Sequence, residues 1–134
     1  MSDLIRFGVS MESNLLEEFD RFIERRNYSN RSEAIRDLIR DSFTEQEWAE
    51  NRQAAGAIVM KCKYGPGDLS DRLLNIQHKH RDVVVSSLHV HLDEERCLRV
   101  IVVKGPSNEI KEMAQEMQSL KGVYHCEVAK VVAG

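Results

Sequence analysis

A group of metal-binding residue types lies close together in the second half of the chain. Four of the five histidines lie between residues 78 and 91, and Cys97 follows shortly after them. His89 and His91 are two residues apart, so on a β-strand their imidazoles project from the same face. The polar run 93–96 predicts a hairpin turn that brings Cys97 back towards His91. Two imidazoles and a thiolate that converge form part of a metal-ligand shell, which suits zinc, copper, iron or nickel.

A fourth donor is needed to complete a four-coordinate site, and His78 and His80 are the candidates. Both lie on a predicted helix over residues 68–80. Residues two positions apart on a helix point to different sides of it. They cannot bind the same ion, and we expect one of them to complete the site, within the chain or from a neighbouring copy. Cys62 and Cys126 lie within apolar strands, and we interpret both as buried hydrophobic residues.

The segment that carries these donors, residues 51–134, predicts an α+β domain. Apolar residues at strand or helix spacing place the elements in the order strand, helix, strand, strand, helix, strand. The strands are expected over 57–64, 83–92, 97–104 and 123–132, and the helices over 68–80 and 107–121. This βαββαβ order is the ferredoxin-like arrangement, whose helices cover one face of the sheet. The open face favours self-association.

The first 50 residues predict a separate domain of one strand and two helices. Residues 4–11 alternate and predict a strand with one apolar face, formed by Ile5, Phe7, Val9 and Met11. No partner strand follows in the next forty residues, so we expect pairing with the same strand of a second chain. Helices are predicted over 14–26 and from Asn30 towards residue 48, with Asn30 and Glu33 forming a capping box.

The amino-acid composition limits the classes of protein to which the chain can belong. The chain has 134 residues, of which 42% are hydrophobic and 31% charged, as in globular proteins. We see no signal peptide and no membrane span, and three cysteines without a disulfide spacing indicate a reducing cytoplasm. The net charge is −3, and the first 50 residues are acidic. A DNA-binding function would therefore depend on a few well-placed arginines rather than on a broad basic face.

Two motifs carry a resemblance to a known family. The stretch Asn30-Arg31-Ser32-Glu33-Ala34-Ile35-Arg36-Asp37, with the strand and helices around it, resembles the ribbon-helix-helix DNA-binding fold. Gln77-His78, His89-x-His91 and Cys97 are similar to the nickel-responsive regulators of the NikR family, and the likeness extends over essentially the whole chain.

The resemblance implies a homotetramer in which two N-terminal dimers flank four ACT-like C-terminal domains. It implies Ni(II) in a square plane, with His89, His91 and Cys97 from one subunit and His78 from another. His80 would then lie near the site or at a weaker one. A second cation site between the domains is implied at Glu33 and Asp37; the alternative is that both are ordinary solvated charges on a helix.

The DNA side follows from the paired strands. Two such strands form an antiparallel ribbon that enters the major groove of double-stranded DNA. Arg6 and Ser10 point outwards and are expected to contact base edges, whereas Arg31 and Arg36 are expected to hold phosphates. Gly8, between the first two, has no side chain for a base contact. The loop at residues 65–67 also lacks the basic residues with which some members of the family reach DNA.

Together with these residues, the resemblance implies a nickel-responsive transcriptional repressor that binds a palindromic operator when Ni(II) is bound and controls nickel-uptake genes. Two other classes of function stay open. One is a metal storage or delivery protein, and the other is a ribbon-helix-helix repressor that senses a small organic ligand. An enzyme is not expected, because no carboxylate near the histidines is placed as a general base.

Overall fold

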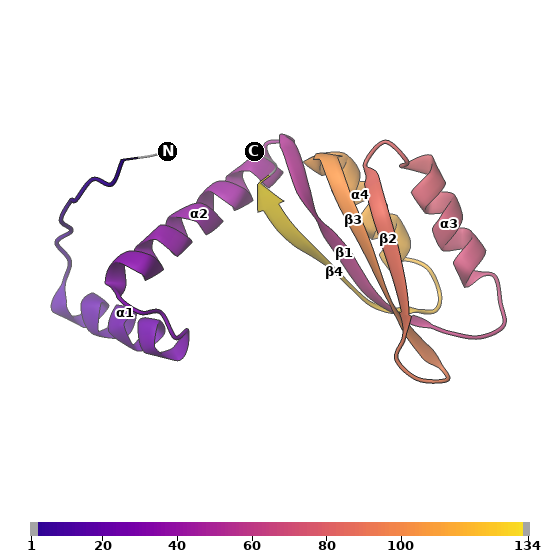
Figure 1. The fold of residues 1–134 in the computed structure, drawn as a ribbon, viewed down its shortest axis with the longest axis horizontal. Coiled ribbons are helices and arrows are strands. Elements are labelled where there is room, and N and C mark those ends of the chain that lie inside the picture. The colour runs from indigo at the N-terminus through magenta and orange to yellow at the C-terminus, as the bar shows by residue number, and fades with distance from the viewer. Residues whose placement is uncertain (1–2, 133–134) are drawn as a thin grey trace. The chain divides into compact units, whose positions relative to one another are not determined.

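The computed structural model describes residues 3–132, whose contacts form two units (Figure 1). The first unit ends at Asp41 and the second begins at Ser42. Helix α2 (Arg31–Ala49) runs without a break across this division, so its first part belongs to one unit and its last part to the other. Within the described residues, no helix is both long enough and apolar enough to cross a membrane.

The first unit contains α1 (Ser13–Arg25) and the beginning of α2. The turn between them includes Asn27, which has a positive φ of 59°. Asn30 Oδ1 accepts a hydrogen bond from the Glu33 backbone N–H at 2.9 Å, so the predicted cap of the second helix is confirmed. Only Ala34 is fully buried among the hydrophobic residues described in this unit. Two helices of this size do not enclose a core by themselves.

Residues 3–12 form neither a helix nor a strand in the single chain. Their apolar side chains are exposed, with Leu4 at 94% and Phe7 at 72%. A strand is defined by hydrogen bonds to a neighbour, and the described residues of one copy provide none for this segment. A hollow of about 850 Å³ lies between this segment and the two helices. The strand predicted over residues 4–11 is therefore not formed in the single chain.

The second unit is a four-stranded antiparallel sheet with two helices, as the sequence predicts. Its elements are β1 (Gln53–Lys63), α3 (Leu69–Lys79), β2 (Val84–His91), β3 (Arg96–Pro106), α4 (Ser107–Gln118) and β4 (Val123–Val132). The strand order is β2-β3-β1-β4, with β2 at one edge. This is the ferredoxin-like arrangement, and the predicted fold class is confirmed.

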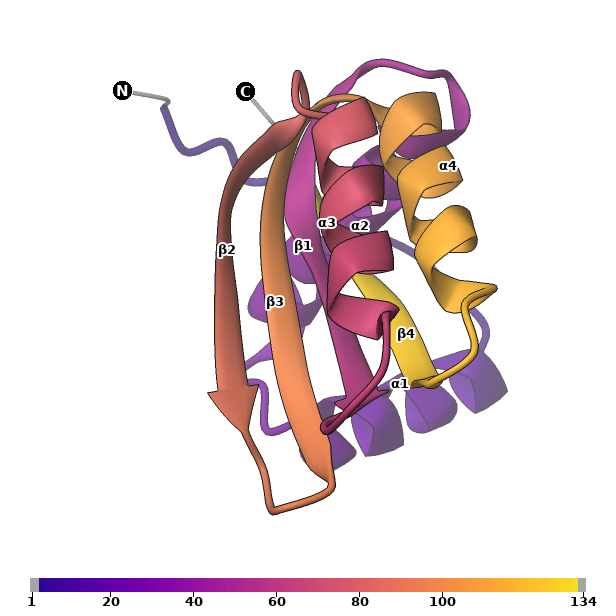
Figure 2. The same cartoon turned by 90° about the vertical axis from the view of Figure 1, so that its right-hand side faces the viewer.

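Both helices cover the same face of the sheet (Figure 2). Alternate residues of β1 and β3 point into this layer, and the buried side chains are Ile58, Met60, Cys62, Cys97, Ile101 and Val103 from the strands, with Leu73, Ile110, Met113 and Met117 from the helices. The opposite face exposes large apolar residues, which include Leu88 at 60% and Val90 at 41%. A sheet with one uncovered apolar face is expected to associate with another surface.

Two features fix the ends of this layer. Trp48, in the last turn of α2, is 1% exposed, and its indole Nε1 donates to the Val131 carbonyl at 3.1 Å. The Ser107 hydroxyl donates to the Trp48 carbonyl at 2.7 Å.

On β2 the register against β3 shifts between Val84 and Ser86, which is a β-bulge.

Candidate metal centre

The strand register places the predicted ligands on one face of the sheet. His91 lies directly opposite Cys97, and His89 lies opposite Arg99. Paired residues of antiparallel strands project from the same side, and the buried Cys97 shows that this is the side covered by the helices. Because β2 is the edge strand, His89 and His91 are nevertheless exposed. The sequence prediction of one shared face is confirmed for these three residues.

The two imidazoles are neighbours, and an aromatic ring lies against them. The His89 and His91 ring centroids are 5.3 Å apart. The ring of Tyr64 lies 4.0 Å from that of His91 and 6.3 Å from that of His89. The Tyr64 backbone N–H donates to the Glu95 carbonyl at 2.8 Å, which holds the end of β1 against the hairpin. Tyr64 was missed in the sequence, because its place depends on the pairing of β1 with β3.

The hairpin between His91 and Cys97 is stabilised by one carboxylate. Asp93 Oδ1 accepts from the backbone N–H groups of Glu95 at 2.9 Å and Arg96 at 2.8 Å. Its other oxygen accepts from Arg96 Nε at 2.9 Å. These hydrogen bonds, the Glu95 backbone first, hold the pKa of Asp93 below its ordinary value. The predicted turn is confirmed.

Behind the predicted ligands lies a second thiol. Cys62 of β1 is the direct partner of Cys97 in the register, and both are fully buried. Burial, with a contribution from Cys97, raises the pKa of Cys62 to about 11. Cys126 is half-buried, and burial raises its pKa as well. Cys62 is therefore a buried residue as expected, but it lies in the same cross-strand row as His91 and Cys97.

Arg99 brings a positive charge next to the histidines. Its Nη2 donates to the Ser70 hydroxyl of α3 at 2.8 Å, while its buried Nε has no hydrogen-bond partner in the described structure. Burial and then the charge of Arg99 lower the pKa of His89. A lower pKa keeps this imidazole neutral, the form that coordinates metals. Arg99 was missed in the sequence, although strand alternation from Cys97 places it on the same face.

The two candidates for a fourth ligand have different surroundings. His78 is exposed in the last turn of α3, whereas His80, just after that helix, is 3% exposed and contacts two carboxylates of α4. Among the described residues, no three or more His, Cys, Asp or Glu side chains are arranged to hold a metal ion. One chain thus brings together two imidazoles and an adjacent thiol, without a completed ligand set. These donors, nitrogen and sulfur, are ones that nickel accepts.

The carboxylates predicted for a second cation site both have partners within their own unit. Glu33 accepts from the Ser29 backbone N–H at 3.2 Å. Asp37 accepts a short hydrogen bond from the Tyr28 hydroxyl, which raises the pKa of Tyr28. The two groups lie one turn apart on α2, so a cation bound there would compete with these contacts.

The residues predicted to contact DNA all lie in the first unit and are exposed. Arg6, Gly8 and Ser10 are in the segment that has no pairing partner in one chain. A Cβ built on Gly8 would have no neighbour within 4 Å. Arg31 forms two hydrogen bonds to the carboxylate of Asp20, at 2.9 and 3.0 Å, so α1 fixes the direction of its guanidinium.

Comparisons with known proteins agree with the two units. A family model described as "Ribbon-helix-helix protein, copG family" matches residues 5–45, and one described as "NikR C terminal nickel binding domain" matches residues 55–131. Proteins named "Putative nickel-responsive regulator" are similar over nearly the full length. The relative from Thermococcus onnurineus is 49% identical over 98% of this chain and 96% of its own, and that from Geobacter sp. (strain M21) is 44% identical over 100% and 97%. A solved structure, the uncharacterized protein TM1266 from Thermotoga maritima, aligns with a TM-score of 0.51 at 10% identity, covering 62% of this chain and 100% of that chain. At this identity the likeness shows only the fold.

A ribbon-helix-helix unit joined to a nickel-binding domain defines a metal-responsive, DNA-binding transcription regulator rather than an enzyme. The chain belongs to the NikR family of nickel-responsive regulators, and Ni(II) is the metal it binds.

Proposed function

We propose that the chain is a cytoplasmic repressor of nickel-uptake genes, which binds a palindromic operator as a homotetramer when Ni(II) is bound. The observation that carries the proposal is the arrangement at the edge of the sheet. His89 and His91 are neighbours, Cys97 lies opposite His91, and the ligand set is not completed within one chain. A site of this kind joins subunits when it fills, and so links metal binding to the quaternary structure.

The fourth ligand in this proposal is His78 from a neighbouring copy. His78 is exposed on α3, and the uncovered apolar face of the sheet offers a surface for assembly. Residues 51–134 then form the metal-binding and tetramerisation domain, and residues 1–50 form the DNA-binding domain. When bound, Ni(II) would join two subunits through coordinate bonds to ligands from both chains. The side chains that supply these ligands would set the position of the metal.

The DNA-binding role rests on the segment that remains unpaired in one chain. Two copies of residues 4–11 would pair as an antiparallel ribbon, bury the apolar side chains over the hollow in the first unit, and turn Arg6, Gly8 and Ser10 outwards. Arg31 and Arg36 would hold phosphates on either side. Glu33 and Asp37 form a second cation site in this proposal, in exchange for their contacts with Ser29 and Tyr28.

The test combines a nickel titration with DNA footprinting on the wild type, Cys97→Ala, His78→Ala and the control Cys126→Ala. A thiolate-to-nickel charge-transfer band and nickel-dependent protection are expected for the wild type and the control. Cys97→Ala should lose both, because it removes the thiolate ligand. Unchanged nickel-dependent footprinting by Cys97→Ala refutes the proposal. Nickel binding without any sequence-specific protection of DNA would instead indicate storage or delivery.

A further inference from the structure

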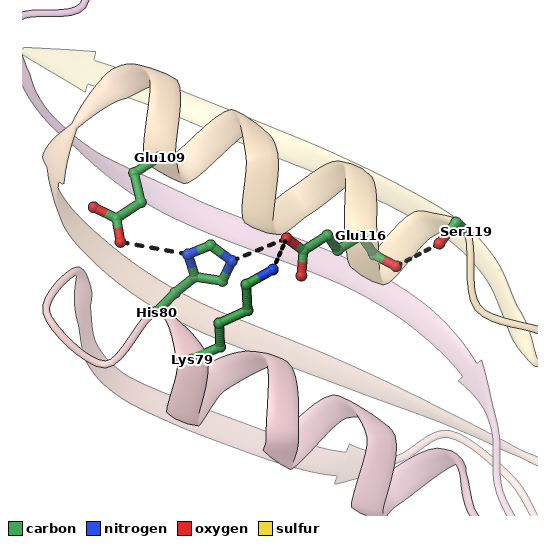
Figure 3. Close-up of polar contacts among 5 residues, drawn as sticks. All are labelled: Lys79, His80, Glu109, Glu116 and Ser119. Carbon is green, nitrogen blue, oxygen red and sulfur yellow. Dashed lines mark hydrogen bonds and ion pairs between the residues drawn. The ribbon is translucent and has the colours of Figure 1, made fainter.

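One buried polar cluster lies outside the residues assigned to nickel. His80, 3% exposed, is placed between two glutamates of α4 (Figure 3). Its Nδ1 is 3.4 Å from Glu109 Oε1, and its Nε2 is 3.2 Å from Glu116 Oε1. Lys79 Nζ lies 2.9 Å from the same Glu116 oxygen. Contacts at both ring nitrogens leave the imidazole no freedom to turn without breaking one of them.

The polar groups of the cluster are paired with one another. Carboxylate oxygens only accept hydrogen bonds, so a ring N–H of His80 and the Lys79 ammonium are the donors that face the two glutamates. The hydrogen bond from Lys79, followed by that from His80, holds the pKa of Glu116 below its ordinary value. A buried polar side chain is tolerated when it is paired in this way, and removal of one partner leaves the others without compensation.

The cluster supplies polar contacts at the end of α3. Leu73 is the only fully buried side chain of α3, and Leu69 and Ile76 pack partly buried against the core. Leu74 is 63% exposed, and His78 is exposed in the last turn. Beyond Ile76, the end of α3 is tied to α4 by the contacts of His80 with Glu109 and Glu116 and by that of Lys79 with Glu116. His78 lies two residues before His80, so its backbone position follows from the same anchor.

We propose that His80, held between Glu109 and Glu116, is a positioning residue that fixes the last turn of α3 and so places His78 for nickel binding. The inference rests on the proposed function, in which His78 is a ligand. In this arrangement His80 touches no metal. Its contacts restrict the conformations of the last turn of α3 before the metal binds. The side chain of His78 therefore points in one direction, towards a neighbouring copy.

The experiment is a double-mutant cycle on nickel affinity, with the tetramer and the thiolate-to-nickel band measured in parallel. His80→Leu should weaken nickel binding about 10- to 100-fold, the usual effect of losing a residue that orients a metal ligand. In a His78→Ala background the same change should have little further effect, because the ligand that it positions is absent. Arg72→Ala is the matched control, since it removes an exposed ion pair with Asp68 at the other end of α3. The control should bind nickel as the wild type does.

A second variant keeps the test decisive if His80→Leu does not fold. Glu109→Gln with Glu116→Gln preserves the volume of both side chains but weakens their hold on His80, and it should reduce nickel affinity in the same direction. Wild-type affinity in both variants overturns the inference. Equal losses with and without His78 also overturn it, since they indicate general destabilisation. A wild type without the charge-transfer band, or a His78→Ala protein with unchanged affinity, instead contradicts the proposed ligand set and removes the basis of the inference.

Discussion

Trp48 offers a direct test of how the end of α2 is attached to the sheet unit. The side chain is 1% exposed, and it is the only tryptophan in the chain. Truncation of a buried Trp to Ala costs about 3–5 kcal/mol of unfolding free energy, because apolar contacts are lost and a cavity remains. Loss of the hydrogen bond to the Val131 carbonyl adds about 1 kcal/mol. The higher helix propensity of Ala offsets less than about 1 kcal/mol of this loss. The lost packing therefore makes the variant less stable than the wild type.

The assay is chemical unfolding followed by far-ultraviolet circular dichroism. Protein concentration is held constant, because the stability of any protein that self-associates depends on it. We expect Trp48→Ala to lose about 3–5 kcal/mol and Trp48→Phe to lose about 1–2 kcal/mol, because Phe keeps most of the apolar volume but not the N–H donor. Gln46→Ala, at an exposed position of the same helix, should change stability by less than about 0.5 kcal/mol. If the loss of unfolding free energy for Trp48→Ala exceeds that of this control by less than about 1 kcal/mol, the packing argument is refuted.

Three further predictions concern the sheet and its hairpin. Gly56→Ala would place a Cβ 2.2 Å from the Ala129 carbonyl oxygen, so it should lower the melting temperature by several degrees, whereas Gly8→Ala, with open space around it, should not. Asp93→Ala should destabilise the protein at neutral pH. The contribution of this low-pKa carboxylate is complete above its ordinary pKa of about 3.9 and is lost as the pH falls through the lower folded value, so melting curves of variant and wild type should converge in acid. With its pKa at about 11, Cys62 should resist alkylation at pH 7 in native protein, and rapid modification there would contradict the burial.

The sequence predicted those parts of the site that depend on local geometry. Strand alternation and a short turn are enough to bring His89, His91 and Cys97 to one face, and the structure has the same arrangement. Cys62 and Tyr64 joined them only through the pairing of β1 with β3, which no local pattern reveals. The two residues are therefore typical of what single-sequence reasoning misses.

Two other features depend on packing between distant parts or between chains. The burial of His80 requires α3 to lie against α4, so the spacing of the histidines alone could separate His78 from His80 but could not assign either a partner. The strand predicted over residues 4–11 is not formed in the single chain, and its apolar face is exposed. Its alternating pattern can be read from the sequence, but the strand partner that we propose for it, a second copy, cannot.

The bulge in β2 separates the placement of the two ends of the strand. Beyond the shift between Val84 and Ser86, His91 pairs with Cys97, and the turn at Asp93 fixes that pairing from the other end. Deletion of Val85 would remove the extra residue and leave Val84 opposite Val103 and Ser86 opposite Val102 in a regular ladder. Side-chain alternation would then keep His89 and His91 on the face of Cys97. A single-codon deletion at position 85 should therefore preserve nickel sensing, since the bulge sets how the strand enters the sheet and the hairpin sets where the ligands lie.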